Sequence, residues 1–278
     1  MNKLPNFDAQ FAKYLEKWVR ANSTKFKTPE LMEAKVPDVY LRWLNTPAPW
    51  LDGLTPGAAF ADHSDAVELT ALLAEYSVAG LPIPDPLMER IVELGEDASG
   101  ELAAIALTPS SSAELRVTAL NLLKECSPLA QALDDGLAEL LLSDADADVK
   151  DVAAELLVAQ GRRVVNPLLL RLSRAGDQDA ERLLDVLCNF PGDDSIYDYA
   201  MKCFLGRPDR RALMASYLGK LGDRRAIAHL EKSLNLTELN YLDYIEIRGA
   251  IESLGGEVTT QRDFSGDPYY ESMRAMRG

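Results

Sequence analysis

The sequence predicts an all-α protein built as a stack of repeated helix pairs. Apolar residues recur at spacings of three and four along most of the chain, which is the period of an amphipathic helix. No strand pattern interrupts these segments. When the second helices of successive predicted pairs are aligned, one apolar column recurs at spacings of 34, 31, 30 and 33 residues, formed by Leu123, Leu157, Cys188, Leu218 and Ile251. A pair of short helices with its turns occupies about 30–34 residues, so the period matches one helix pair.

Residues 1–62 are predicted to form an aromatic-rich helical N-terminal cap. An amphipathic helix is expected over residues 6–21, because Phe7, Phe11 and Trp18 recur on one face. Further helix starts are expected where a Pro falls in the first helical turn, at Thr28–Pro29, Val36–Pro37 and Thr55–Pro56.

The segment 40–60 gathers large aromatic residues, namely Tyr40, Trp43, Trp50 and Phe60. We interpret them as packing that closes the end of the stack, because a terminal repeat has no neighbour to cover its apolar face. A ligand-binding aromatic box is the alternative interpretation.

Residues 63–256 are predicted to form the repeat array. Ser64 is expected to cap its first helix, and a second helix starts after the prolines of residues 81–86. Further helices are expected at residues 98–107, 112–126, 128–142, 147–160, 164–174, 178–189, 195–205, 209–221, 224–235 and 240–254.

Two turns of this array share one plan, LGDRRAIAHL at residues 221–230 and QGRRVVNPLL at residues 160–169. In each, a Gly ends one helix, a short basic turn follows, and an apolar run starts the next helix. Gly161 and Gly222 are expected in the left-handed conformation that ends a helix. Pro167 falls in a first turn, where its missing N–H costs little.

The motif L-G-D-x-R-A-I-x-x-L, with A-A-x-x-L in the helix before a Gly, resembles the short HEAT repeats of phycobilin-lyase-like bacterial proteins. The resemblance covers about residues 64–255. It implies a right-handed α-α superhelix, a HEAT/armadillo-like solenoid. It implies no single activity, because such repeats are similar across scaffolds, lyases and DNA glycosylases. The tetratricopeptide and ankyrin signatures are missing.

Residues 257–278 follow the array without a repeat register. Phe264, Tyr269 and Tyr270 are candidates to cover the last helix pair, so this segment is predicted to be a C-terminal tail or cap. A mobile arm is the alternative, since chain termini are often disordered.

The net charge of −15 is concentrated in the middle of the sequence. Residues 46–161 hold 4 Lys and Arg against 21 Asp and Glu, a net charge of −17, whereas residues 1–45 carry +3 and residues 162–278 carry −1. Phosphate backbones bind through Lys and Arg, so nucleic acid is a poor partner for this middle segment. With no long apolar stretch and no secretion signal, we expect a cytoplasmic protein without a membrane segment.

The sequence contains no residue pattern that predicts a metal site, a cofactor site or a catalytic centre. Its three cysteines are far apart, and only His63 and His229 accompany them. Residues 144–155 resemble an EF-hand loop, but Val149 stands where that loop needs Gly, so an acidic turn between helices is the interpretation we favour. Phosphate-binding and dinucleotide-binding Gly motifs are missing as well.

Two charged surfaces remain as candidate binding sites. The acidic one, a candidate surface for a basic partner, is formed by Glu89, Glu93, Asp97, Glu101, Asp134, Asp135 and Glu139. The basic edge, a candidate for an acidic peptide or phosphate, is formed by Arg162, Arg163, Arg210, Arg211, Arg224 and Arg225. Solvated helix faces and turns are the alternative for both.

These observations predict a non-enzymatic scaffold or adaptor that binds a protein or peptide on one face of the helix stack. The alternatives are a repeat-scaffold enzyme of the DNA glycosylase or chromophore-lyase kind, suggested only by the resemblance, and a structural assembly subunit. The sequence leaves open whether the chain is a monomer or a homodimer.

Overall fold

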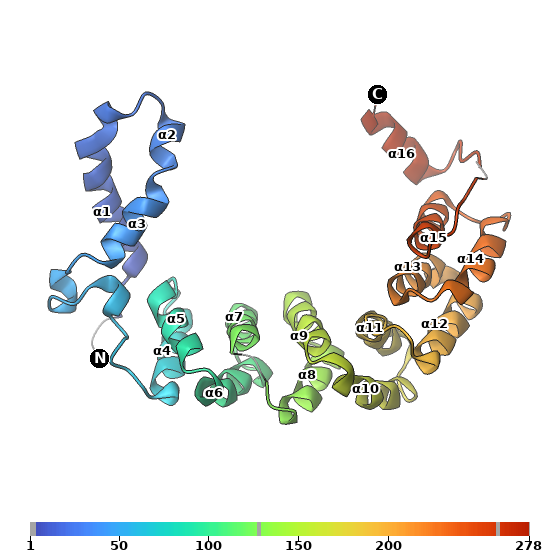
Figure 1. The fold of residues 1–278 in the computed structure, drawn as a ribbon, viewed down its shortest axis with the longest axis horizontal. Coiled ribbons are helices and arrows are strands. Elements are labelled where there is room, and N and C mark those ends of the chain that lie inside the picture. The colour runs from blue at the N-terminus through green and yellow to red at the C-terminus, as the bar shows by residue number, and fades with distance from the viewer. Residues whose placement is uncertain (1–3, 127–128, 260–261, 278) are drawn as a thin grey trace. The chain divides into compact units, whose positions relative to one another are not determined.

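The fold is all-α, as the sequence predicts. The computed structural model describes residues 4–126, 129–259 and 262–277. These residues form sixteen α-helices and six short 3-10 helices, and none of them lies in a strand (Figure 1). Helix starts and ends agree with the expected ranges to within a few residues along the array.

The helices follow one another with short turns. The first nine α-helices are α1 (Phe7–Asn22), α2 (Pro29–Glu33), α3 (Val36–Leu44), α4 (Ala66–Val78), α5 (Asp85–Glu93), α6 (Glu96–Leu107), α7 (Ala113–Glu125), α8 (Ala132–Leu142) and α9 (Ala147–Ala159). The others are α10 (Val165–Leu172), α11 (Asp177–Leu187), α12 (Asp194–Gly206), α13 (Arg211–Leu221), α14 (Ile227–Leu234), α15 (Tyr241–Ser253) and α16 (Pro268–Arg277). The 3-10 helices are η1 (Ser23–Lys25), η2 (Pro49–Leu51), η3 (Pro56–Ala58), η4 (Gly161–Val164), η5 (Pro208–Arg210) and η6 (Arg224–Ala226).

The chain divides into two compact units. Unit 1 consists of Met1–Gly136 and Ala145–Val152, and unit 2 consists of Leu137–Asp144 and Ala153–Gly278. Each unit has its own buried apolar side chains, such as Leu102 in unit 1 and Leu218 in unit 2. The predicted sequence boundaries at residues 62 and 256 lie inside these units.

Aromatic side chains form the core of the N-terminal part of unit 1. Phe7 is 3% exposed and contacts the rings of Trp43, Trp50 and Phe60 at centroid distances of 5.0–6.4 Å. The Tyr76 hydroxyl on α4 donates to the Pro5 carbonyl at 2.9 Å. These contacts agree with the packing interpretation of residues 40–60.

Two of the predicted helix starts need correction. Thr55–Pro56 begins only the 3-10 turn η3, because a Pro at a first-turn position does not by itself extend a helix. The first helix of the array is capped by Asp65 rather than Ser64, and the Asp65 carboxylate accepts from the Val67 backbone N–H at 2.9 Å. Thr28 caps α2 as predicted.

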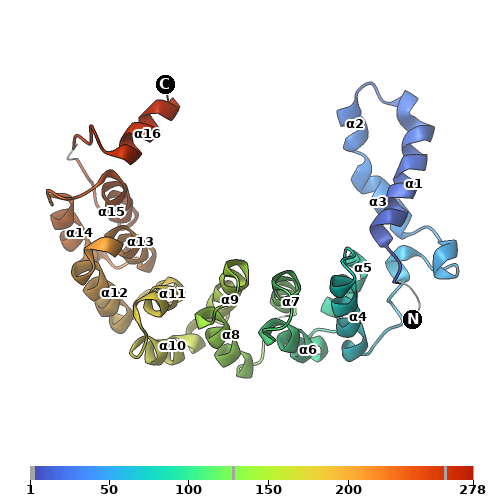
Figure 2. The same cartoon turned by 180° about the vertical axis from the view of Figure 1, so that it is seen from behind.

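In unit 1, the first helices of successive pairs pack against each other, and so do the second helices. Within this unit α4 contacts α6, α5 contacts α7, and α6 contacts α7. Figures 1 and 2 show α5 and α7 as neighbours from opposite sides. Residues about one period apart in the sequence are therefore brought together on adjacent helices.

Unit 2 repeats this arrangement with closer packing. Within it α13 packs against α12 and α15, and α14 packs against α15. The approach of α13 to α15 depends on Gly219, because a Cβ there would lie 2.9 Å from Ser253 Oγ and 3.1 Å from Ala250 Cα.

The described part of the C-terminal segment docks on the last helix pair. Phe264 is buried, and its ring lies 5.2 Å from that of Tyr241 and 4.9 Å from that of Tyr244. The Arg262 guanidinium donates to carbonyls of the turn that follows α14, including that of Thr237 at 2.6 Å. Arg262 and Phe264 thus contact the last helix pair, as the cap interpretation expects.

The predicted apolar column is completely buried. Each of its members is 0% exposed, namely Leu123, Leu157, Cys188, Leu218 and Ile251. The two predicted turns also adopt the expected geometry, with Gly161 at φ 70° and Gly222 at φ 76°. Asp223 then accepts from the Arg225 backbone N–H at 2.9 Å and starts η6.

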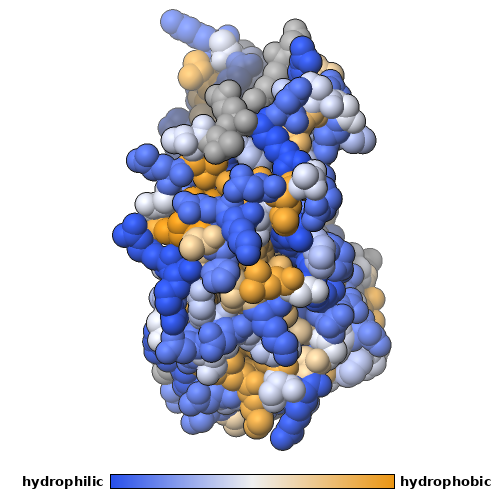
Figure 3. Space-filling model, turned by 90° about the vertical axis from the view of Figure 1, so that its right-hand side faces the viewer, coloured by the Kyte–Doolittle hydropathy of each residue, from blue (hydrophilic) through white to orange (hydrophobic). Residues whose placement is uncertain are grey.

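The surface carries separate apolar patches between hydrophilic side chains, as the view in Figure 3 shows for one face. Exposed large apolar residues include Leu170, Leu205 and Leu242. Among the described residues, no helix combines the length and the apolar character that crossing a membrane requires.

Candidate functional site

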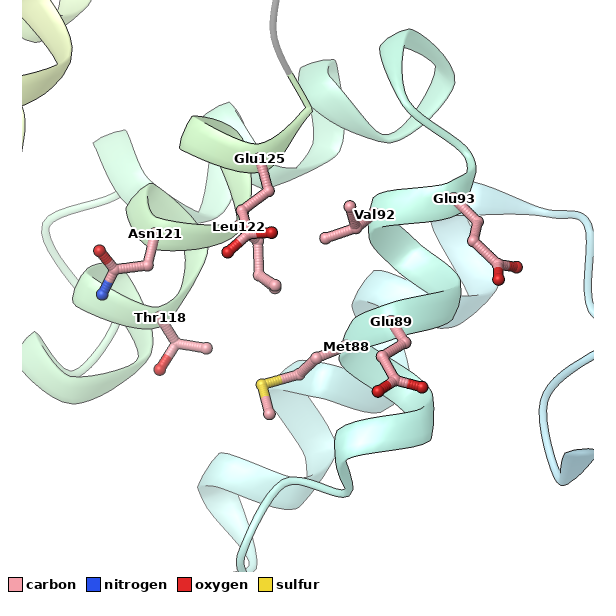
Figure 4. A pocket seen from close by; sticks show the side chains of 8 residues that line it. All are labelled: Met88, Glu89, Val92, Glu93, Thr118, Asn121, Leu122 and Glu125. Carbon is pink, nitrogen blue, oxygen red and sulfur yellow. The ribbon is translucent and has the colours of Figure 1, made fainter. Parts of the chain in front are cut away.

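The candidate site is a groove between α5 and α7 of unit 1 (Figure 4). Its volume is about 600 Å³. The side chains that line it come from two turns of each helix at most, and they are Met88, Glu89, Val92, Glu93, Thr118, Asn121, Leu122 and Glu125.

The spacing of the lining residues along α5 and α7 explains how they form the two walls of the groove. On α5 the lining residues fall at positions 88, 89, 92 and 93, and on α7 they fall at positions 118, 121, 122 and 125. Residues three and four apart share one face of a helix, so each set forms one side of the groove. Met88 and Val92 point toward Leu122, and these three side chains make its apolar floor.

Three carboxylates stand at the rim of this floor. Glu93 is held by Arg90, whose Nη1 lies 2.8 Å from the Glu93 carboxylate, and in Figure 4 it points away from the groove. Glu89 on α5 and Glu125 on α7 are exposed, and neither forms an ion pair with any residue that the structure describes. The groove is therefore amphipathic, with an apolar floor and uncompensated negative charge.

Neighbouring titratable groups experience this negative charge. Burial raises the pKa of Tyr40 well above its usual range, and the acceptor Asp85 and the charges of Asp8 and Glu89 raise it further. The Tyr40 hydroxyl donates to Asp85 at 2.8 Å at the start of α5. At the other wall, burial raises the pKa of Cys126, and the charge of Glu125 adds to the effect.

Only two of the seven predicted acidic residues lie in the groove. Glu89 and Glu93 line it, whereas Asp97 and Glu101 lie on α6 and take no part. The remaining three, Asp134, Asp135 and Glu139, lie on α8, where Glu139 is 4.0 Å from Arg171.

Sequence reasoning missed the α7 wall and Met88. The repeat period contained the signal, because Met88 and Asn121, Glu89 and Leu122, and Val92 and Glu125 are each 33 residues apart. Side chains one period apart therefore lie at equivalent positions of adjacent helices, and here both members of each pair line the same groove.

Most arginines of the predicted basic edge contact other residues of unit 2. Arg162 donates to the Pro191 carbonyl, and Arg163 donates to the Gln160 side chain at 2.6 Å. Arg211 is 9% exposed, and the Arg210 guanidinium lies 3.1 Å from Glu181.

Arg225 contacts two carboxylates and an aromatic ring. It lies 2.7 Å from Asp194 and 2.6 Å from Asp223, and its guanidinium stacks 4.2 Å from the Tyr197 ring centre. These two carboxylates raise its pKa, and Arg225 in turn holds the pKa of Asp223 below its usual value. It joins α12 to the turn before α14.

One contact is shared by the two basic turns. The guanidinium of Arg162 lies 3.9 Å from where a Cβ on Gly192 would be, and that of Arg224 lies 3.9 Å from the same position on Gly255. Both glycines have positive φ and follow the second helix of the next pair. The first Arg of each basic turn therefore packs on the end of the following repeat.

The structure offers no cluster of metal ligands among the residues it describes. In the EF-hand-like segment, Val149 is 0% exposed on α9, and Asp146 accepts from the Asp148 backbone N–H at 3.0 Å, as expected for an acidic turn. Burial raises the pKa of Cys188 to about 12, so its thiol stays protonated at neutral pH.

Comparisons with known proteins add no further constraint. No protein-family model matches the chain, and neither the curated proteins nor the solved structures that were searched include a match.

Proposed function

We propose that this protein is a non-enzymatic interaction module that binds a basic protein or peptide at the α5–α7 groove. The observation that carries the proposal is the pairing of an apolar floor with Glu89 and Glu125, two carboxylates that form no ion pair with a described residue. A cationic partner with an apolar contact surface complements both features.

The charge distribution supports a basic partner. Residues 46–161 carry a net charge of −17, and only four Lys or Arg are available there to offset it. Arg90 and Arg116 are already engaged, with Arg116 donating to the Ala106 carbonyl at 2.8 Å. Such a field accelerates the encounter with cations and repels anions.

We also propose that the helix pairs form a right-handed α-α superhelix of the HEAT type. Support comes from the buried column at spacings of 30–34 residues and from the recurring contact of a turn Arg with the next repeat. Small-angle scattering of the full chain tests this arrangement, because a superhelix is more extended than a globule of equal mass.

Charge reversal in the groove tests the proposed function. The double variant Glu89→Lys/Glu125→Lys is expected to bind Lys-rich peptides at least about tenfold more weakly than the unmodified chain, since attraction becomes repulsion. The matched control is Glu75→Lys/Glu231→Lys, which has the same net charge and changes exposed residues of α4 and α14. Equal weakening in both variants would show that only net charge acts, and the groove proposal would then be abandoned.

A further inference from the structure

We infer that the segment bound in the α5–α7 groove is a basic amphipathic α-helix. Its apolar stripe would lie on Met88, Val92 and Leu122, and its Lys or Arg side chains would stand beside Glu89 and Glu125. This inference rests on the proposed function and adds the conformation and the sequence pattern of the partner.

The length of the groove fits two turns of helix. The lining residues of α7 run from Thr118 to Glu125, seven residue steps, which at 1.5 Å per residue is about 10.5 Å. A partner helix places apolar side chains at i, i+3 or i+4, and i+7 over the same length. The volume of about 600 Å³ exceeds that of a single side chain and accommodates such a row.

The hydrogen bonding of the partner's backbone favours a helix over an extended chain in this groove. Both walls are α-helices whose main chain is already paired, and the described residues contain no strand edge that could accept an added strand. An extended segment would press unpaired N–H and C=O groups on the apolar floor, and burying such groups is costly. A helix satisfies these groups internally.

The positions of the carboxylates set the charge pattern of the partner. Glu89 projects from α5 and Glu125 from α7, so they stand on opposite sides of the floor. Cations are therefore required on both flanks of the apolar stripe rather than on one. Glu93, which Arg90 already pairs at 2.8 Å, contributes little to this pattern.

Two peptides of identical composition test the inference against the full chain. Both contain Leu, Lys and Ala and are about 14 residues long, near the length at which isolated helices become marginal in water. In one, Leu recurs at i, i+3, i+7 and i+10 with Lys on both flanks, and in the other the same residues are scrambled. The periodic peptide is expected to bind at least about tenfold more tightly, by fluorescence anisotropy, and to gain helical circular dichroism on binding.

Groove variants locate the binding. Glu89→Gln/Glu125→Gln is expected to weaken binding of the periodic peptide, because its flanking Lys lose their partners, whereas Glu75→Gln/Glu231→Gln is expected to leave that affinity unchanged. Equal affinity for the two peptides overturns the helix inference and leaves the proposed function standing. An unchanged affinity for the periodic peptide in the groove variant places the helix elsewhere and also overturns the inference. If neither peptide binds, the proposed function fails with it.

Discussion

Single residues in the turns determine where each helix pair of unit 2 ends. Gly222 ends α13 in the left-handed conformation, Asp223 caps the turn that follows, and Arg225 ties that turn to α12 through Asp194. Because backbone conformation, capping and ion pairing act at adjacent positions, each can be changed separately.

Replacing Gly222 tests how much its backbone conformation contributes to the stability of the protein. A Cβ there meets nothing within 4 Å, so the φ of 76° is the only source of strain in Gly222→Ala. We expect this variant to lose about 1 kcal/mol of unfolding free energy in urea denaturation. The control, Gly249→Ala in α15, also meets open space but has ordinary helical φ, and should gain up to about 1 kcal/mol. A loss in both variants would contradict this explanation.

The pKa of Asp223 gives unit 2 a pH dependence. Hydrogen bonds from Arg225 hold this pKa below its ordinary value of 3.8. A carboxyl with a depressed folded-state pKa stabilises the fold above its unfolded-state pKa, and this stabilisation is lost as the pH falls through the folded-state pKa. The difference in unfolding free energy between the unmodified chain and Asp223→Asn should thus stay constant from neutral pH down to about 5 and shrink below about 4. A difference that persists unchanged into strong acid would point to lost packing instead of charge.

Within elements, the residues of the apolar column are buried on, or directly after, the second helices of the pairs. Leu218 is 0% exposed on α13, and Leu218→Ala is expected to cost about 3 kcal/mol by removing apolar contacts and leaving a cavity. Leu205→Ala on α12, where the side chain is 57% exposed, should change stability by less than about 0.5 kcal/mol. Hydrogen exchange of α13 amides in both variants measures the difference, and similar costs would argue against the column as the core of the repeat.

How far the sequence predicts these elements depends on the range of the interactions. Gly161, Gly222 and Leu218 were predictable, because turn geometry and repeat packing act within one helix pair. Arg162 and Arg225 were not, because their partners Pro191 and Asp194 lie about 30 residues away and a charged turn residue looks the same whether paired or solvated.

The groove shows the same limit at the level of helices. Its acidic side was predicted from α5, where Glu89 and Glu93 share a face, but Asp97 and Glu101 on the next helix do not join them. The opposite wall was overlooked because Thr118 and Asn121 are uncharged and Glu125 is the only acidic side chain of α7 that lines the groove. Adjacent second helices such as α5 and α7 are related by the period, so residues about one period apart lie on neighbouring helices.

For the molecule as a whole, charge is the property that best separates the candidate functions. Residues 46–161 carry −17. Within the predicted basic edge, Arg211 is buried and Arg162 and Arg225 have polar partners, whereas Arg224 is exposed. A nucleic-acid-binding enzyme needs free cations in a continuous surface.

This charge distribution disfavours binding to DNA. In a gel-shift assay at about 10 mM ionic strength, where screening extends over about 30 Å, the full chain should not retard duplex DNA. Low salt favours any phosphate contact, so the absence of a shift there is more decisive than at physiological salt. Retardation that weakens as salt increases would reveal Lys and Arg of residues 1–45 or 162–278 gathered on one surface. That result would favour the glycosylase-like alternative over an adaptor for basic partners, since the same groove carboxylates that attract a cationic helix repel a phosphate backbone.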